Sequence, residues 1–195
     1  MSRLLFLSAA AALLSTVTAL PTPPNRFSGR GQIWVLNSTD LLDALPSDRI
    51  GCLDAHGALT LNHCAVFTQL DQAPHTLSSR IGSCGFRDEN MPTNKDSYYG
   101  RDSHAWACQP DDAAVRSPPD ENYYTLNGLP YPFICNGNIN CIYDIKTVPS
   151  REDDGAPVWQ YYWGSEEMQV APGHLRTMWL WVPVASPNAA EDESD

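Results

Sequence analysis

The sequence predicts an all-β or β-dominated α+β protein: a single disulfide-stapled domain of short antiparallel strands with at most one short helix. Three observations lead to this prediction. No window of the chain shows a sustained helical period, and the 16 proline and 12 glycine residues are spread among short β-favouring runs. The six cysteines form an even set in a chain whose first residues are typical of an exported protein.

The N-terminus has the features of a secretory signal peptide. Arg3 supplies an early positive charge, residues 4–14 are almost wholly apolar, and Val17 and Ala19 are small residues at the spacing that signal peptidase requires. The apolar run is shorter than the roughly 20 residues that cross a membrane. We therefore predict a signal peptide over residues 1–19 and a secreted, extracellular protein.

One domain is expected after the signal peptide. Residues 20–31 are rich in proline and glycine and are predicted to form an extended leader, and the acidic tail at 185–195 is predicted to be disordered. Residues 32–184 would then form a single β-rich domain. The polar, Pro-rich stretch 110–122 is predicted to be a surface loop, because the segments that it joins are each too short to bury a core.

Short β-favouring runs, separated by glycine, asparagine and proline, are the predicted strands. The first is expected at 32–36, followed by one or two helical turns that begin at Ser38 or Thr39 and stop before Pro46. The other predicted strands lie around His56-Gly57, over 65–70, around Gly82, on either side of Gly100, around Asn127-Gly128, beside the 135–141 loop, at 158–163 and at 175–184.

All six cysteines are predicted to be oxidised, because their spacings match no zinc site. The turn-forming sequence CNGNINC favours one short disulfide loop. Order along the chain suggests the same local closure for the others, which gives Cys52 with Cys64, Cys84 with Cys108, and Cys135 with Cys141.

The net charge of the chain and its sequence motifs limit the kinds of partner and ligand that we expect. The formal net charge of −11 disfavours nucleic acid and anionic membrane surfaces, whose phosphates would be repelled. No cofactor is predicted, and no metal either, since Asp54, His56 and His63 match no zinc or calcium spacing. Asn37-Ser38-Thr39 is a glycosylation acceptor and should lie on the surface of a glycoprotein.

The stretch 157–184 holds four of the six tryptophans and raises the question of a ligand-binding surface. Alternation in its two predicted strands places Trp159, Tyr161 and Trp163 on one face, and Trp179 and Trp181 on one face of the other strand. If these faces are exposed, the rings form a platform on which sugars can stack. A sheet covered on both faces would bury the same rings instead.

Candidate catalytic residues are few. Asp102 and His104 would share a strand face, as an oriented acid–base pair requires. Glu166 and Glu167 are adjacent and would point to opposite faces of a strand, so they cannot flank one glycosidic bond together. No serine hydrolase, zinc protease or phosphate-binding motif occurs. Whether the protein is an enzyme is left open, with binding favoured over turnover.

The segments RIGCLDAHGALTLNHCAVFT (49–68) and SCGFRDENMPTNKDSYYGRDSHAWAC (83–108) resemble those of small secreted cysteine-containing proteins of filamentous fungi, most of which have no assigned activity. The resemblance includes the signal peptide, the six cysteines and the short glycine-punctuated strands, and it brings no catalytic motif. It implies an extracellular or host-facing protein, sometimes effector-like, that often acts by binding.

Binding of a cell-wall or host glycan is the leading functional hypothesis. A secreted hydrolase that acts on a glycan or nucleic acid is the first alternative, with Asp102 and His104 or one of the two glutamates as acid–base groups. The second alternative is an inhibitor or effector that binds a host extracellular protein through its loops at 87–97 or 110–122.

Overall fold

The computed structural model describes residues 27–69, 76–110, 122–136, 141–152, 154–166 and 169–185 of the chain. Within these residues the protein is all-β, as predicted, with every strand pair antiparallel. The predicted signal peptide, most of the leader and residues 186–195 lie outside the described residues.

Twelve strands and one 3-10 turn are described: β1 (Gly29–Leu36), η1 (Pro46–Asp48), β2 (Arg49–Leu53), β3 (Leu59–Thr60), β4 (Phe67–Gln69), β5 (Leu77–Ser78), β6 (Ser83–Gly85), β7 (Ala107–Gln109), β8 (Tyr123–Thr125), β9 (Phe133–Asn136), β10 (Tyr143–Ile145), β11 (Val158–Gln160) and β12 (Leu175–Pro183). The helical turns predicted from Ser38 onward are reduced to one hydrogen-bonded turn, in which Ala44 N–H donates to Asp40. The short helix begins only at Pro46.

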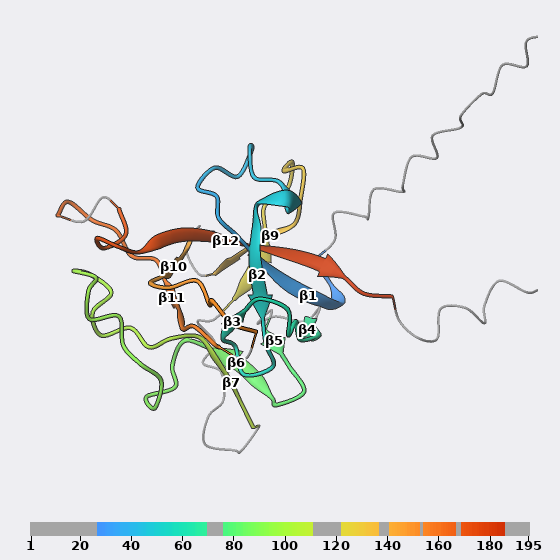
Figure 1. Cartoon of the computed structure of the whole chain (residues 1–195). Coiled ribbons are helices and arrows are strands. Elements are labelled where there is room, and N and C mark those ends of the chain that lie inside the picture. The colour runs from blue at the N-terminus through green and yellow to red at the C-terminus, as the bar shows by residue number, and fades with distance from the viewer. Residues whose placement is uncertain are drawn as a thin grey trace, which may run out of the picture.

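The two longest strands, β1 and β12, pair at the centre of the sheet and run from Gly31 opposite Pro183 to Leu36 opposite Met178 (Figure 1). From β1 the sheet continues through β4, β5, β6 and β7, and from β12 it continues through β10 to β11. Two branches complete it, because β2 and β3 join β1, whereas β9 and β8 join β12. Every other strand of the sheet is therefore connected to β1 or β12, either directly or through its neighbouring strands.

Both faces of β12 are covered by protein. Met178 and Leu180 on one face belong to a small cluster with Leu36, Ala44 and Phe133. Trp179 and Trp181 on the other face belong to the larger core, which also contains residues of β1, β4, β9, β10 and β11. The strict alternation along β12 thus separates two buried clusters rather than a buried face from a wet one.

Stacked aromatic rings form the centre of the larger core. The rings of Tyr143 and Trp179 are nearly parallel, with centroids 3.6 Å apart, and Trp106 meets Trp179 at a steep angle. Trp106 Nε1 donates to the hydroxyl of Tyr123 over 2.7 Å, and the hydroxyl of Tyr143 donates to the carbonyl of Ile134. Burial raises the pKa of the Tyr143 phenol well above its ordinary value. The polar tips of Trp106 and Tyr143 are thus satisfied inside the core, whereas the buried Nε1 atoms of Trp179 and Trp181 have no hydrogen-bond partner among the described residues.

All three predicted disulfides are confirmed. They join Cys52 to Cys64, Cys84 to Cys108 and Cys135 to Cys141, and no described cysteine is free. The second links β6 to β7, where its two cysteines are directly opposite in the register. Three disulfides indicate an oxidising compartment. No helix among the described residues has the length and apolar character needed to span a bilayer.

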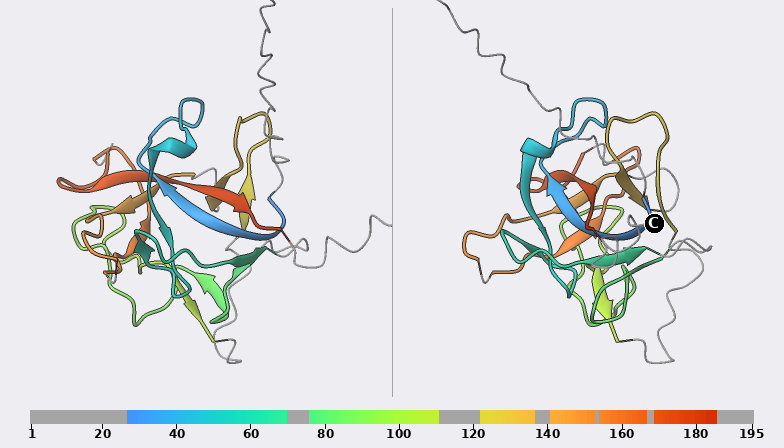
Figure 2. Two further views of the ribbon diagram at one scale, coloured as in Figure 1. Left: turned by 45° about the vertical axis from the view of Figure 1, so that its right-hand side comes forward. Right: turned by 90° about the vertical axis from the view of Figure 1, so that its right-hand side faces the viewer.

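The segment 86–106 differs most from prediction. Strands were expected on both sides of Gly100, but these residues form a long loop with a single bridge between Thr93 and His104. Polar side chains satisfy its backbone locally: Asp88 accepts the N–H of Asn90, and Ser97 accepts the N–H of Gly100. This loop and the connection from β11 to β12 lie at the same end of the molecule (Figures 1 and 2).

Candidate functional site

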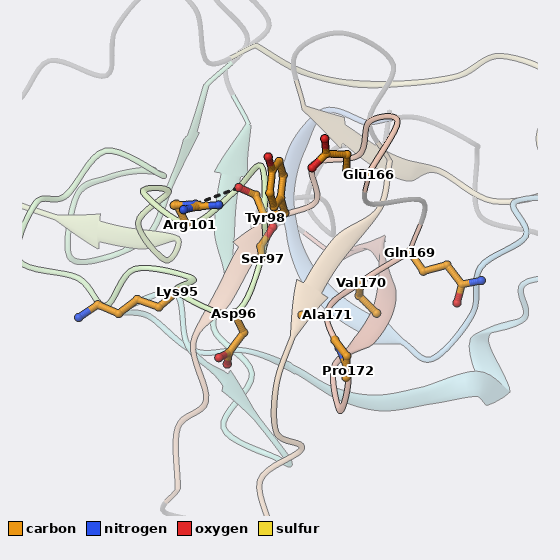
Figure 3. Close-up of a pocket in the computed structure, with 10 residues that line it drawn as sticks. All are labelled: Lys95, Asp96, Ser97, Tyr98, Arg101, Glu166, Gln169, Val170, Ala171 and Pro172. Atoms are coloured by element: carbon orange, nitrogen blue, oxygen red, sulfur yellow. Dashed lines mark hydrogen bonds between the residues drawn. The ribbon is translucent and has the colours of Figure 1, made fainter.

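An open groove of about 630 Å³ lies between these two loops. One wall comes from residues 95–101 and the other from the connection between β11 and β12, as Figure 3 shows. Charged, polar and apolar side chains are mixed in its lining, which consists of Lys95, Asp96, Ser97, Tyr98, Arg101, Glu166, Gln169, Val170, Ala171 and Pro172.

Four exposed aromatic side chains lie on the same two loops, and we call them the aromatic patch: Tyr98, Tyr99, Tyr162 and Trp163. Their exposed fractions are 50%, 41%, 38% and 68%. The rings of Tyr98 and Tyr99 meet edge to face with centroids 4.9 Å apart. Large aromatic side chains are rarely this exposed in one place without a partner to contact. The aromatic patch is therefore the surface most suited to binding.

Glycines lock the two loops together. A side chain at Gly164 would collide with the ring of Tyr99, and one at Gly100 would press against Tyr162. Each loop thus accepts an aromatic ring of the other against a bare backbone position. The hydroxyl of Tyr99 also lies 3.3 Å from Ser165 Oγ and accepts the backbone N–H of Glu166 over 3.3 Å. The aromatic patch is held in place by these cross-loop contacts.

Polar groups surround Tyr98 at the upper end of the groove (Figure 3). Arg101 Nε donates to the carbonyl of Tyr98 over 3.1 Å, and its guanidinium lies 5.0 Å from the centre of the Tyr98 ring. A hydrogen bond to the carboxylate of Glu166 raises the pKa of the Tyr98 phenol, because it stabilises the protonated form. Donors and acceptors are thus placed beside an exposed ring.

A partly buried ionic cluster adjoins the groove, and we call it the histidine cluster: Asn94, Asp96, Asp144, Lys146 and His174. His174 Nδ1 is 2.8 Å from Asp144 Oδ1, and His174 Nε2 is 3.2 Å from Asp96 Oδ2. Asn94 Nδ2 donates to the other oxygen of Asp144 over 2.7 Å, and Lys146 Nζ donates to Asp96. The side chains of His174 and Asp144 are almost completely buried, whereas that of Asp96 is about half exposed at the groove.

The turn before β12 aims His174 at its partners. Ala171, Pro172, Gly173 and His174 close it with a hydrogen bond from the N–H of His174 to the carbonyl of Ala171 over 2.9 Å. Gly173 has a φ of +84°, as the third residue of a type II turn requires, and proline is favoured before it. Since Ala171 and Pro172 line the groove, the same turn builds one wall and orients the histidine.

Both ring nitrogens of His174 face carboxylate oxygens, Nδ1 that of Asp144 and Nε2 that of Asp96. Hydrogen bonding with Lys146, followed by hydrogen bonding with His174, lowers the pKa of the Asp96 carboxyl and keeps it ionised. Both ring nitrogens are thus engaged inside the cluster, which joins the groove wall at Asp96 to β10 and to the turn before β12.

The predicted aromatic platform is wrong for four of its five residues. Trp159 and Tyr161 are buried, and Trp179 and Trp181 lie in the larger core. Two physical causes explain the error: β12 is covered on both faces, and β11 ends at Gln160, so the alternation predicted up to residue 163 stops early. Trp163 is the exception, because it lies beyond the strand in the aromatic patch.

The proposed catalytic pair is not assembled. Asp102 is exposed in a turn closed by the N–H of Ser103 and the carbonyl of Gly100, so it shares no strand face with His104. His104 is half-buried, with Nδ1 3.0 Å from the carbonyl oxygen of Met91. Glu166 is exposed in the groove. Glu167 lies outside the described residues.

The structure also shows the surroundings of Asp54 and Asn37, two further residues considered in the sequence. Asp54 Oδ1 accepts the backbone N–H groups of His56 and Ala58 over 2.9 Å each, so this carboxylate caps a turn. The described residues contain no group of three histidine, cysteine or acidic side chains placed to hold a metal ion. Asn37 is exposed at the end of β1, where a glycan could be attached.

Sequence reasoning did not find the three tyrosines of the aromatic patch or the histidine cluster. A signal for the first was present, since Tyr98 and Tyr99 stand among serine, glycine, aspartate and arginine, a composition typical of loops rather than of buried strands. No local signal existed for the second, because Asp96, Asp144 and His174 are far apart in the sequence and meet only through the fold.

No family model matches the chain, and neither a curated protein nor a solved structure matches it. The described residues form an all-β, disulfide-stapled domain with an open groove and four exposed aromatic side chains at one end.

Proposed function

We propose that this is a secreted glycan-binding protein whose binding surface consists of the groove and the aromatic patch. One observation carries the proposal: four exposed aromatic rings lie on two interlocked loops beside an open groove. The ligand is a cell-wall or host polysaccharide.

Sugar recognition needs two kinds of contact, and both are available. Pyranose rings present C–H groups that pack on the faces of indole and phenol rings. Trp163 offers the largest exposed ring for this purpose. The hydroxyl groups of the sugar need donors and acceptors at the ring edge, and Arg101, Glu166 and Gln169 supply them.

The openness of the site favours a polymer over a small free sugar. Small ligands are usually enclosed in pockets that bury most of their surface. Here Tyr98 lines an open groove, and Tyr99, Tyr162 and Trp163 are exposed on the same two loops. A polysaccharide chain could lie across several rings at once and gain affinity from repeated weak contacts.

Extracellular location is part of the same proposal. The signal-like N-terminus, the three disulfides and the exposed acceptor Asn37 are all expected of a glycoprotein that passes through the secretory pathway. Polysaccharides of cell walls and host surfaces are accessible to such a protein.

Protein binding is a second candidate function, and the composition of the aromatic patch supports it. Tyrosine, tryptophan and arginine are the residues most enriched where proteins contact one another strongly. In that case the partner would be a host extracellular protein that covers the same loops. The hydrolase alternative has less support, because Asp102 and His104 are not arranged as an acid–base pair.

Retention on insoluble chitin, β-glucan and cellulose tests the proposal. We expect the parent protein to be retained by at least one of them, and Trp163→Ala and Tyr98→Ala each to weaken retention about two- to tenfold, the value of one aromatic contact. Leu42→Ala is the matched control, because Leu42 is 71% exposed but lies outside the aromatic patch, and it should bind like the parent.

Two results would contradict glycan binding at this site. One is that folded parent protein is retained by none of these polysaccharides or by soluble host glycans on an array. The other is that retention is unchanged in the folded double variant of Trp163 and Tyr98. Specific capture of one extracellular protein, lost in the same double variant, would instead favour the second candidate.

A further inference from the structure

We propose that the groove prefers glycans with an isolated carboxylate, a uronic or sialic acid on an otherwise neutral chain, and that Arg101 is the residue that recognises this group. The inference rests on the proposed function, because it names the class of sugar that the same groove selects. It adds a separate prediction, which is that removing the carboxylate from the ligand weakens binding.

Arg101 is an exposed cation that is held in place without a carboxylate. Its Nε donates to the carbonyl of Tyr98 over 3.1 Å, and its guanidinium lies over the Tyr98 ring, 5.0 Å from the centroid. No acidic side chain in the described part of the chain forms an ion pair with it. Its terminal N–H groups therefore remain available, and their planar fork matches a carboxylate through two parallel hydrogen bonds.

The two acidic side chains of the groove lining are already engaged. Asp96 accepts a hydrogen bond from Lys146 and is paired with it. Glu166 forms a hydrogen bond with the hydroxyl of Tyr98, which raises the pKa of that phenol because the protonated form is the donor. Both carboxylates thus have partners other than Arg101, whose charge is left for a ligand.

The charges near the groove favour one anionic group over a polyanion. Lys95 and Arg101 are exposed cations of the lining, and Lys146 lies beside it. These three positive charges exceed by one the two negative charges of Asp96 and Glu166. Charges farther away than about 8 Å are largely screened at physiological salt, so this local excess acts on a single carboxylate. A continuous polyanion would instead meet the formal net charge of −11 of the whole chain.

The surroundings of Tyr98 also favour one orientation of an acidic sugar (Figure 3). The guanidinium of Arg101 lies over the ring, whereas Glu166 interacts with the hydroxyl at the edge of the ring. A sugar packed against the exposed part of Tyr98 would find a donor for its carboxylate at Arg101 and an acceptor for its hydroxyl groups at Glu166. The opposite orientation would place two carboxylates side by side and is disfavoured by their repulsion.

The first experiment compares two forms of one polysaccharide. Glucuronoxylan carries separate glucuronic acids on a neutral xylan chain, and chemical reduction converts each carboxylate to a primary alcohol. The parent should bind the acidic form about three- to tenfold more tightly than the reduced form, as expected for one exposed, charge-assisted contact. This preference should shrink at about 0.5 M salt, where screening is stronger. Sialyllactose and lactose form the equivalent pair for a host glycan, so a preference in only one pair identifies the source.

The second experiment measures the ratio of the affinities for the acidic and the neutral member of a pair in variants. In Arg101→Gln the ratio should fall to about one, because the amide donates hydrogen bonds but carries no charge. In Arg101→Lys it should be intermediate, because lysine keeps the charge but not the fork. Arg80→Gln is the matched control, because Arg80 is exposed between β5 and β6 and outside the groove lining, and it should keep the parent ratio.

The results that overturn this inference differ from those that overturn glycan binding. If the parent binds both members of each pair equally, or if folded Arg101→Gln keeps the parent ratio, selection by Arg101 is wrong. Glycan binding still stands in that case, provided that retention is lost in the double variant of Trp163 and Tyr98. If the folded parent binds no glycan of either kind, glycan binding itself is wrong.

Discussion

At the scale of single residues, Asp96 shows how one carboxylate can belong to two parts of a protein. It lines the groove, and it also accepts hydrogen bonds from Lys146 and faces His174. Residues that both line a site and hold it in shape tend to affect stability and binding together. Asp96 should therefore respond to pH in both properties.

Acid should weaken the contribution of Asp96 to stability. Its pKa is lowered below the ordinary value in the folded protein, so its contribution is present above about pH 4 and lost as the pH falls through the folded pKa. The free energy of unfolding, measured from about pH 2 to about pH 6, should show parent and Asp96→Asn converging at the acidic end.

A double-mutant cycle supplies the control for this prediction. Lys146→Met should destabilise the parent at neutral pH but have little further effect in the Asp96→Asn background, because the two residues share one interaction. Full additivity of the two substitutions, or a gap between the parent and Asp96→Asn that stays constant down to the lowest pH, would show that Asp96 is not stabilised as its contacts indicate.

At the scale of elements, the strands and the loops of this protein have different tasks. The strands β1 and β12 carry the core on both faces and leave little surface for a ligand. The loops 86–106 and 161–174 carry the aromatic patch and the groove, and their shape depends on turns with specific residues. Binding surfaces placed on loops above a rigid sheet are common, because loops can vary without loss of the core.

Gly173→Ala should change the shape of the groove, whereas Gly128→Ala should not. Gly173 and Gly128 have nearly the same conformation, with φ of +84° and +85°, and open space around the position of a Cβ atom. Alanine at either position should cost about 1 kcal/mol in the free energy of unfolding. Only Gly173→Ala should also weaken polysaccharide retention, because it strains the turn that places Pro172 and His174.

Equal retention by Gly173→Ala and Gly128→Ala, with equal loss of stability, would show that the turn before β12 does not shape the binding surface. Chemical unfolding and the retention assay provide the two measurements on each variant.

At the scale of the whole molecule, tryptophan is found both in the core and on the proposed binding surface. Trp179 stacks on Tyr143 in the centre of the larger core, and Trp163 is exposed at the end of the molecule where the two loops meet. The same indole ring is thus buried in the core in one place and exposed on the proposed binding surface in the other.

Trp179→Ala should destabilise the protein by about 3–5 kcal/mol, the usual cost of removing a buried tryptophan. Trp163→Ala should change the free energy of unfolding by no more than about 0.5 kcal/mol, as expected for an exposed side chain. Denaturant unfolding followed by circular dichroism measures both values. A large loss of stability in Trp163→Ala would mean that its ring is structural, and its role in binding would have to be abandoned.

The sequence by itself determined the class of the fold and suggested the pairing of the cysteines. Short β-favouring runs between glycines predicted most strands, including the hairpin around His56 and the strands beside the 135–141 loop. The order of the cysteines along the chain suggested local pairs, and the structure confirms them, because each disulfide joins two consecutive cysteines of the sequence. These properties depend on interactions between residues that are close in the chain.

Only the tertiary structure decided which aromatic rings are exposed and which ionic groups meet. Alternation places Trp179 and Trp181 on one face of β12, but whether that face is wet depends on what covers it, and the covering residues come from distant strands. Asp96, Asp144 and His174 are likewise brought together by the pairing of β10 with β12 and by the path of the 86–106 loop. A one-dimensional pattern can place a side chain on a face, but only packing in three dimensions determines whether that face contacts protein or water.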